Sequence, residues 1–192
     1  MDPQDGGVSE LDVRPLVETA PDLARRLEAL TAALAGAEEQ PQVLRLLVEA
    51  GRDALGGIAG LVWLLRGDLL ELAFPEGRGR SPLVERFARF PLSTQLPVCD
   101  AIRTLQPLVF ESLVAMAAVY PASVAASESP SRAWAVLPLV IGGRGVGGVL
   151  FSFADERSFS AEERELLVAM VGQASLALER CGLVGGAGAG EG

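Results

Sequence analysis

The chain has 192 residues, of which 49% are hydrophobic, enough to form the core of one domain of ordinary size. Its 16 basic and 25 acidic residues give a formal net charge of −9, which disfavours non-specific binding to nucleic acid because that binding needs clustered positive charge. With no His and only two Cys, the chain lacks the usual general base, the usual zinc and haem ligands and a disulfide framework.

The first 20 residues are acidic and contain Gly6, Gly7 and Pro15, which predicts a flexible head. No signal-peptide pattern opens the chain and no apolar stretch reaches the roughly 20 residues that span a bilayer, so we expect a cytoplasmic protein. All the basic residues are Arg, and Lys and Asn are absent, a composition typical of a high-GC bacterial genome.

Two amphipathic helices are expected next. Leu23, Leu27, Leu30 and Leu34 recur at spacings of four, three and four, which places them on one helical face. This face either lies on its own domain or pairs with a second copy of the chain. A break at 36–41 precedes a second helix over 42–55.

Apolar runs at 58–65 and 69–74 flank Gly67-Asp68 and predict a β-hairpin. The middle of the chain is mixed. It predicts short helices over 83–90, 98–105 and 111–120, a short strand over 107–110 and a loop over 121–131.

The stretch from Ala133 to Arg180 predicts a second hairpin and a long helix. Apolar runs at 133–141 and 145–153 flank Gly142-Gly143, which can adopt the positive φ of a tight turn. Ser160 and Glu163 match a capping box at the start of a helix of about 20 residues. Residues 185–192 are Gly-rich and predict a flexible tail.

This order predicts an α+β fold in one domain over 21–184. Consecutive strands joined by tight turns form an antiparallel sheet, and the terminal helices cover one face. The irregular segment over 75–131 then covers the other face or leaves a cavity there.

The chain resembles a GAF domain of the bacterial signalling type, similar to those attached to actinobacterial serine phosphatases or sensor kinases. The resemblance rests on AVLPL at 135–139, GRGVGGVL at 143–150, FSAEE at 159–163 and QASLALER at 173–180, with a further similarity over 92–109. It implies a central antiparallel sheet of five or six strands, terminal helices on one face, a ligand pocket on the other and dimerisation through the terminal helices.

The sequence departs from several branches of that family. It lacks the Asn-Lys-Phe-Asp-Glu signature of the cyclic-nucleotide branch, the Cys-His pair of bilin-binding relatives and the His of haem-binding relatives. The methionine-sulfoxide reductase branch uses several pocket Cys, and only Cys99 is in the corresponding region. We therefore expect no cofactor, no metal site and no catalytic residues.

The expected ligand-binding residues are mainly aromatic side chains: Trp63, Phe74, Phe87, Phe90, Cys99, Tyr120, Trp134 and Val136. The alternative is that these side chains form plain core. Because the small Ala133 and Ala135 suit close helix packing, strand alternation directs Trp134 and Val136 to the pocket side. Four Arg at 78, 80, 86 and 89 either face an anionic ligand or lie on an exposed loop.

Cys99 lies near the start of a predicted helix, where the pKa of a thiol can be lowered and the thiol made reactive. The alternative, that Cys99 is a small buried core residue, is favoured. Cys181 is either a free thiol or an intermolecular disulfide partner. The glycines at 143–148 are followed by a strand rather than a helix, which favours a hairpin turn over a phosphate-binding loop.

The main hypothesis is a non-catalytic regulatory domain that senses a small molecule and acts on a separate signalling protein. The expected homodimer interface consists of Leu23, Leu27, Leu30, Leu34, Leu166, Met170, Ala174 and Ala177. The alternatives are a structural or protein-interaction module with a filled pocket and, less favoured, a thiol enzyme using Cys99.

Overall fold

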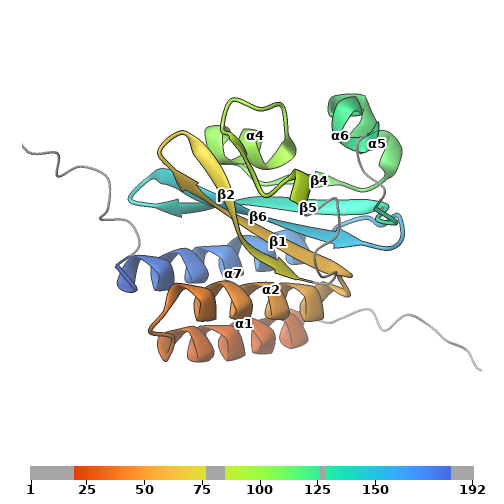
Figure 1. Cartoon of the computed structure of the whole chain (residues 1–192). Coiled ribbons are helices and arrows are strands. Elements are labelled where there is room, and N and C mark those ends of the chain that lie inside the picture. The colour runs from red at the N-terminus through yellow and green to blue at the C-terminus, as the bar shows by residue number, and fades with distance from the viewer. Residues whose placement is uncertain (1–19, 77–84, 126–128, 183–192) are drawn as a thin grey trace, which may run out of the picture.

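The computed structural model describes residues 20–76, 85–125 and 129–182 (Figure 1). Most of the predicted head at 1–20, the tail at 185–192, and Arg78 and Arg80 lie outside these residues. In chain order the elements are α1 (Ala20–Ala35), α2 (Gln40–Leu55), β1 (Ala59–Arg66), β2 (Leu69–Glu76), β3 (Arg89–Pro91), α4 (Pro97–Thr104), β4 (Leu108–Phe110), α5 (Leu113–Val119), α6 (Pro121–Ala125), β5 (Ala133–Ile141), β6 (Arg144–Phe153) and α7 (Ala161–Arg180).

The strands form a six-stranded sheet in the order β3-β2-β1-β6-β5-β4, and every neighbouring pair is antiparallel. The α+β fold and the sheet of five or six strands are therefore confirmed. Gly142 and Gly143 have φ of 56° and 76° in the β5–β6 turn, the left-handed conformation that glycine adopts most easily. Their sequence position predicted this tight hairpin.

Three helices cover one face of the sheet. α2 and α7 lie against the strands, and α1 lies across these two helices as a third layer (Figure 1). The capping box at the start of α7 is present: Ser160 Oγ accepts from the Glu163 N–H, and the Glu163 carboxylate accepts from the Ser160 N–H. On this side the three helices and the sheet share one continuous hydrophobic core.

Ser175 of α7 fixes the helix to β5. The pairing of β5 with β6 shifts between Leu139 and Val140, and the Val140 N–H donates to Ser175 Oγ at 3.2 Å. Ser175 Oγ in turn donates to the Val171 carbonyl at 2.9 Å. A serine that is only 3% exposed thus has both a donor and an acceptor role, as a buried hydroxyl requires.

The side chains expected at the dimer interface are packed inside the chain instead. Leu23, Leu30 and Leu34 are at most 6% exposed, and Leu27 is half-buried against the same core. The four interface residues expected on α7 are also buried there: Leu166, Met170, Ala174 and Ala177. Because α1 covers α7, these residues fill the space between α1, α2, α7 and the sheet.

The other face of the sheet is covered unevenly. α4 packs directly on β6, where a Cβ at Gly148 would lie 2.6 Å from Val98 Cγ2 and one at Gly145 would lie 2.7 Å from Ile102 Cγ2. The missing side chains therefore let this helix approach closely. α5 and α6 stand farther along the sheet, above the end where β5 begins (Figure 1).

The irregular middle differs from the sequence prediction in two places. Phe90, expected at the end of a helix over 83–90, belongs to β3, because Leu70 of β2 pairs with it. The expected loop over 121–131 begins with α6, in which Pro121 occupies the first position, where a proline is tolerated in a helix.

Candidate ligand cavity

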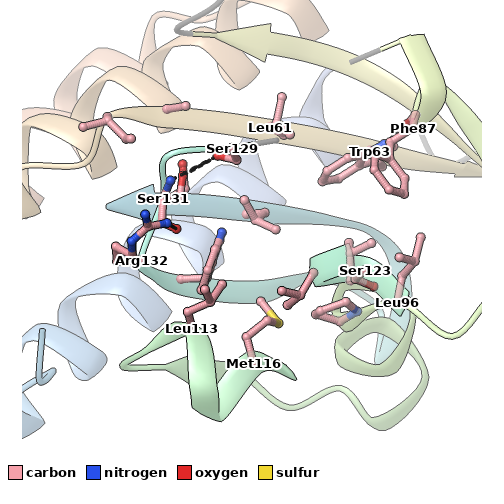
Figure 2. A pocket seen from close by; sticks show the side chains of 18 of the residues that line it. Leu61, Trp63, Phe87, Leu96, Leu113, Met116, Ser123, Ser129, Ser131 and Arg132 are labelled. Atoms are coloured by element: carbon pink, nitrogen blue, oxygen red, sulfur yellow. Dashed lines mark hydrogen bonds between the residues drawn. The ribbon is translucent and has the colours of Figure 1, made fainter. Parts of the chain in front are cut away.

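A cavity of about 280 Å³ lies between the sheet and the α5–α6 segment (Figure 2). Its floor comes from residues of β1, β6 and β5 that face the same side. Ser152 of β6 pairs with Ala59 of β1 and with Trp134 of β5, and all three line the cavity. One row farther along, Leu61 and Leu150 pair and continue the floor.

Strand alternation separates the cavity from the helical core. On β6, Leu150 and Ser152 face the cavity, whereas Val149, Phe151 and Phe153 belong to the core beneath α2 and α7. The predicted facing of β5 is confirmed in the same way, because Ala133 and Ala135 belong to the helical core while Trp134 and Val136 belong to clusters on the opposite face.

The roof is formed by Leu113 and Met116 of α5 and by Ser123 and Val124 of α6. Ser112 caps α5 by accepting from the Ala115 N–H at 3.1 Å. Between the two helices, the Tyr120 hydroxyl donates to Asp100 Oδ2 of α4 at 2.5 Å.

Tyr120 therefore joins the roof to α4. Its ring also packs edge-on against Phe110 at a centroid distance of 5.7 Å. Burial and the hydrogen bond to the Asp100 carboxylate both raise the pKa of Tyr120, so the hydroxyl stays protonated and keeps donating across the physiological range.

The two ends of the cavity differ in chemistry. Ser129, Ser131 and Arg132 gather at one end (Figure 2), where the hydroxyls of the two serines lie 2.7 Å apart. Trp63 and Phe87 form the other end, and the Trp63 indole N–H donates to the Phe87 carbonyl at 2.7 Å. Because its only polar atom is thereby satisfied, Trp63 contributes an apolar ring to the cavity.

Ser123 in the roof has a buried hydroxyl without a hydrogen-bond partner among the described residues. A buried hydroxyl without a partner costs about 1–3 kcal/mol.

Of the eight residues expected to bind a ligand, the structure brings four to the cavity wall: Trp63, Phe87, Phe90 and Trp134. Cys99 and Val136 lie instead in the close-packed cluster under α4. Tyr120 lies behind the roof, and Phe74 packs against the core on the helical face of the sheet. The binding role of all eight remains a prediction.

Cys99 is fully buried, and its Sγ lies 3.8 Å from the Pro91 carbonyl oxygen. Burial raises the pKa of this thiol to about 11, and the nearby Arg103 guanidinium only partly opposes that shift. At neutral pH Cys99 is therefore a thiol without access to the cavity, which is unsuited to nucleophilic attack. Cys181 is half-buried at the end of α7 and forms no disulfide within the described part of the chain.

Of the four arginines weighed as anion ligands, Arg86 and Arg89 belong to the described residues, and neither lines the cavity. Arg89 pairs with Glu71 at 3.2 Å on an exposed part of β2 and β3, and the Arg86 guanidinium lies 6.0 Å from the centre of the Phe87 ring. The charged residue that lines the cavity is Arg132, which the sequence analysis did not single out. The serines of the cavity were not singled out either, and α5 was predicted as a helix but not as part of the site, because small and apolar residues carry no motif.

The part of the chain that the structure describes contains neither a candidate metal site nor a candidate membrane-spanning helix. No three His, Cys, Asp or Glu side chains in 20–76, 85–125 and 129–182 are placed to hold a metal ion. No helix in the same ranges has the length and hydrophobicity to cross a membrane.

Terminal helices on one face of a six-stranded antiparallel sheet, with a cavity under short helices on the other, define a class of small α+β domains with one helical face and one cavity face. The sequence profile of the GAF domain family matches residues 37–179. The chain belongs to this family.

Solved structures share the fold. The GAF domain of an Acinetobacter phosphoenolpyruvate-protein phosphotransferase is 16% identical over 86% of this chain and 97% of its own, with a TM-score of 0.70. The free methionine-R-sulfoxide reductase of Neisseria meningitidis, solved with its substrate, is 19% identical over 85% and 92%, with a TM-score of 0.70. The chromophore-binding domain of an R. palustris bacteriophytochrome is 12% identical over 83% and 62%, with a TM-score of 0.65. No curated protein sequence matches the chain.

Proposed function

We propose that this GAF domain is a non-catalytic sensor that binds a small molecule in the cavity beneath α5 and α6 and regulates a signalling partner. The observation that carries the proposal is the cavity itself, because about 280 Å³ between the sheet and the roof is not filled by the side chains of the described residues. A purely structural module would instead be packed to the density of a protein interior.

Two further observations support an occupant. Apolar walls with a few convergent polar groups are the usual make-up of small-molecule sites. A relative of the same fold, the Neisseria meningitidis reductase, was solved with its substrate.

A thiol enzyme is the less favoured alternative. In the proposed sensor, Cys99 is a core residue, because it is buried outside the cavity wall and burial raises its pKa. A reactive thiol needs exposure and a lowered pKa.

The test is thermal stabilisation by a panel of small metabolites. We expect at least one compound to raise the melting temperature of the wild type but not of Ala59→Phe, whose added ring occupies the cavity floor. Ala73→Phe is the matched control, since Ala73 is an exposed strand residue that does not line the cavity. Equal stabilisation of all three proteins would place binding elsewhere and contradict the proposal.

The proposed output is a change in a homodimer. Because the originally expected interface is buried, we propose that a second copy docks on the outer side of α7. Val168 and Leu176, eight residues apart on that helix, are 50% and 53% exposed. Sedimentation velocity should show that Val168→Glu shifts the wild-type dimer to monomer, whereas Val114→Glu, on the exposed side of α5, leaves the dimer intact. A dimer that tolerates Val168→Glu and Leu176→Glu would contradict this interface.

A further inference from the structure

The polar end of the cavity has a single charged residue. Arg132 is the one charged side chain among the described residues that line the cavity. Its Nη1 donates to the Ser131 carbonyl at 3.2 Å. Within the described residues it pairs with no carboxylate, so most of its five N–H donors are available to a bound molecule.

The neighbours of Arg132 are also donors rather than acids. The Arg132 N–H donates to the Phe153 carbonyl just before β5 begins, and Arg132 and Trp134 both line the cavity. Of the two tryptophans, only Trp63 uses its indole N–H within the described part of the chain. A guanidinium, a tryptophan indole and the hydroxyls of Ser131 and Ser152 therefore share one end of the cavity, with no carboxylate among them.

The opposite end of the cavity is apolar and is unfavourable for a charged group. Phe90 packs edge-on against Trp63 at a centroid distance of 5.9 Å, and Leu96 and Val98 complete that wall. A charged group placed there would lose its hydration without gaining a partner. A bound molecule would therefore have one anionic end and one apolar end.

The volume limits its size. About 280 Å³ lies at the lower end of the roughly 300–1,000 Å³ of typical small-molecule pockets, which favours a small ligand. Tetrapyrroles are far larger. One ring or a branched chain of similar size, with a single head group, matches this space.

We propose that the cavity binds a small amphipathic carboxylic acid, with its carboxylate on Arg132 and its apolar body against Trp63 and Phe90. This inference rests on the proposed sensor function and specifies its ligand class. Arginine and carboxylate are matched in charge and geometry, and the hydroxyls and indole supply further hydrogen bonds.

Intrinsic fluorescence provides the assay. The chain has two tryptophans, and both line this cavity, so a change in tryptophan emission reports its occupation. Three probes share one apolar body and differ in the head group: 4-phenylbutyrate, 4-phenylbutanamide and 4-phenylbutylamine. We expect the acid to bind wild-type protein with a Kd about tenfold or more below that of the amide, as one charge-assisted hydrogen bond provides, and the amine to bind most weakly.

Arg132→Gln removes the guanidinium and should reduce the preference for acid over amide to within about twofold. Arg144→Gln is the matched control, because Arg144 is also an exposed arginine and does not line the cavity. Ser152→Ala should reduce acid binding by a smaller factor while retaining the preference. The melting temperature of each variant verifies folding, which these replacements of weakly bonded side chains should preserve.

The outcomes separate this inference from the proposed function. If the amide binds as tightly as the acid, or if Arg132→Gln keeps the acid preference, the ligand class is wrong and the cavity remains a sensor site for other molecules. If none of the three probes changes the emission, and no metabolite of the panel stabilises the protein, both proposals are overturned.

Discussion

Replacing two helical glycines with alanine should have opposite effects on stability, although the chemical change is the same. Alanine favours a helix over glycine by about 0.8–1.0 kcal/mol. At Gly172 of α7 a Cβ would have no atom within 4 Å, so Gly172→Ala should raise the free energy of unfolding by roughly that amount. At Gly51 of α2 a Cβ would lie 2.4 Å from Phe151 Cζ, about 1 Å closer than an ordinary contact.

The Phe151 ring cannot move aside easily, because it is fully buried beneath α2. Overpacking of this kind costs about 1–3 kcal/mol, so after the gain in helix propensity Gly51→Ala should be destabilising by up to about 2 kcal/mol. The added variant Phe151→Leu shortens the opposing side chain. Combined with Gly51→Ala it should be less destabilising than the sum of the two single changes, by about 1 kcal/mol.

Chemical denaturation of the four variants, at a protein concentration low enough to keep the chain monomeric, measures these differences. For a chain of this size each 1 kcal/mol corresponds to about 2–4 °C in melting temperature. If Gly51→Ala stabilises the protein as much as Gly172→Ala does, then α2 is not seated on Phe151. The packing of the helical layer described above would then be wrong.

Three further predictions concern the cavity side of the sheet. Tyr120→Phe should loosen the roof, because it removes the hydrogen bond to Asp100, and hydrogen exchange of α5 and α6 should rise about tenfold or more while that of α7 stays unchanged. Ser123→Ala deletes a buried hydroxyl that has no partner among the described residues, so the unliganded variant should be as stable as the wild type or up to about 1–3 kcal/mol more stable in denaturant titrations. A clear loss of stability would show that this hydroxyl has a partner. In native protein at pH 8, a thiol reagent should modify Cys181 first and Cys99 only on unfolding; rapid labelling of Cys99, mapped by mass spectrometry, would revive the thiol-enzyme alternative.

The same Cys99 thiol makes stability depend on alkaline pH. Its pKa is raised to about 11 in the folded chain, so its contribution is present below the ordinary thiol pKa and is lost as the pH rises toward 11. Because the chain has no Lys and one Tyr, few other groups titrate in this window. Cys99→Ala should therefore flatten the fall in unfolding free energy between pH 8 and 11, and an unchanged slope would contradict the burial of the thiol.

Local patterns in the sequence account for the sheet and the helical face. The glycine pair at 142–143 and the apolar runs beside it predicted the β5–β6 hairpin, and Ser160 with Glu163 predicted the start of α7. These signals are short in range, so they can be read without knowing the rest of the fold. Strand alternation also predicted correctly which face Trp134 occupies.

The cavity could not be predicted in the same way, because it is the space left between elements far apart in the chain. Cys99 and Trp134 have the same apolar character in the sequence. They differ in the structure because α4 packs down on Gly145 and Gly148, whereas α5 and α6 stand off the sheet. The register that sets Ser152 beside Trp134 likewise depends on long-range pairing of strands.

The alternation along β6 has a mechanical consequence. Ser152 belongs to the cavity floor, and the next residue, Phe153, packs edge-on against Phe159, with the Arg157 guanidinium 4.8 Å from its ring. That guanidinium also bonds to the Leu55 carbonyl at the end of α2 and to Glu163 in the first turn of α7. Ser152 in the cavity floor and Phe153, which contacts the arginine bonded to both helices, are therefore consecutive residues of β6. If a bound molecule displaced this part of the β6 backbone, the contacts to α2 and α7 would shift directly, without any other helix or strand between them.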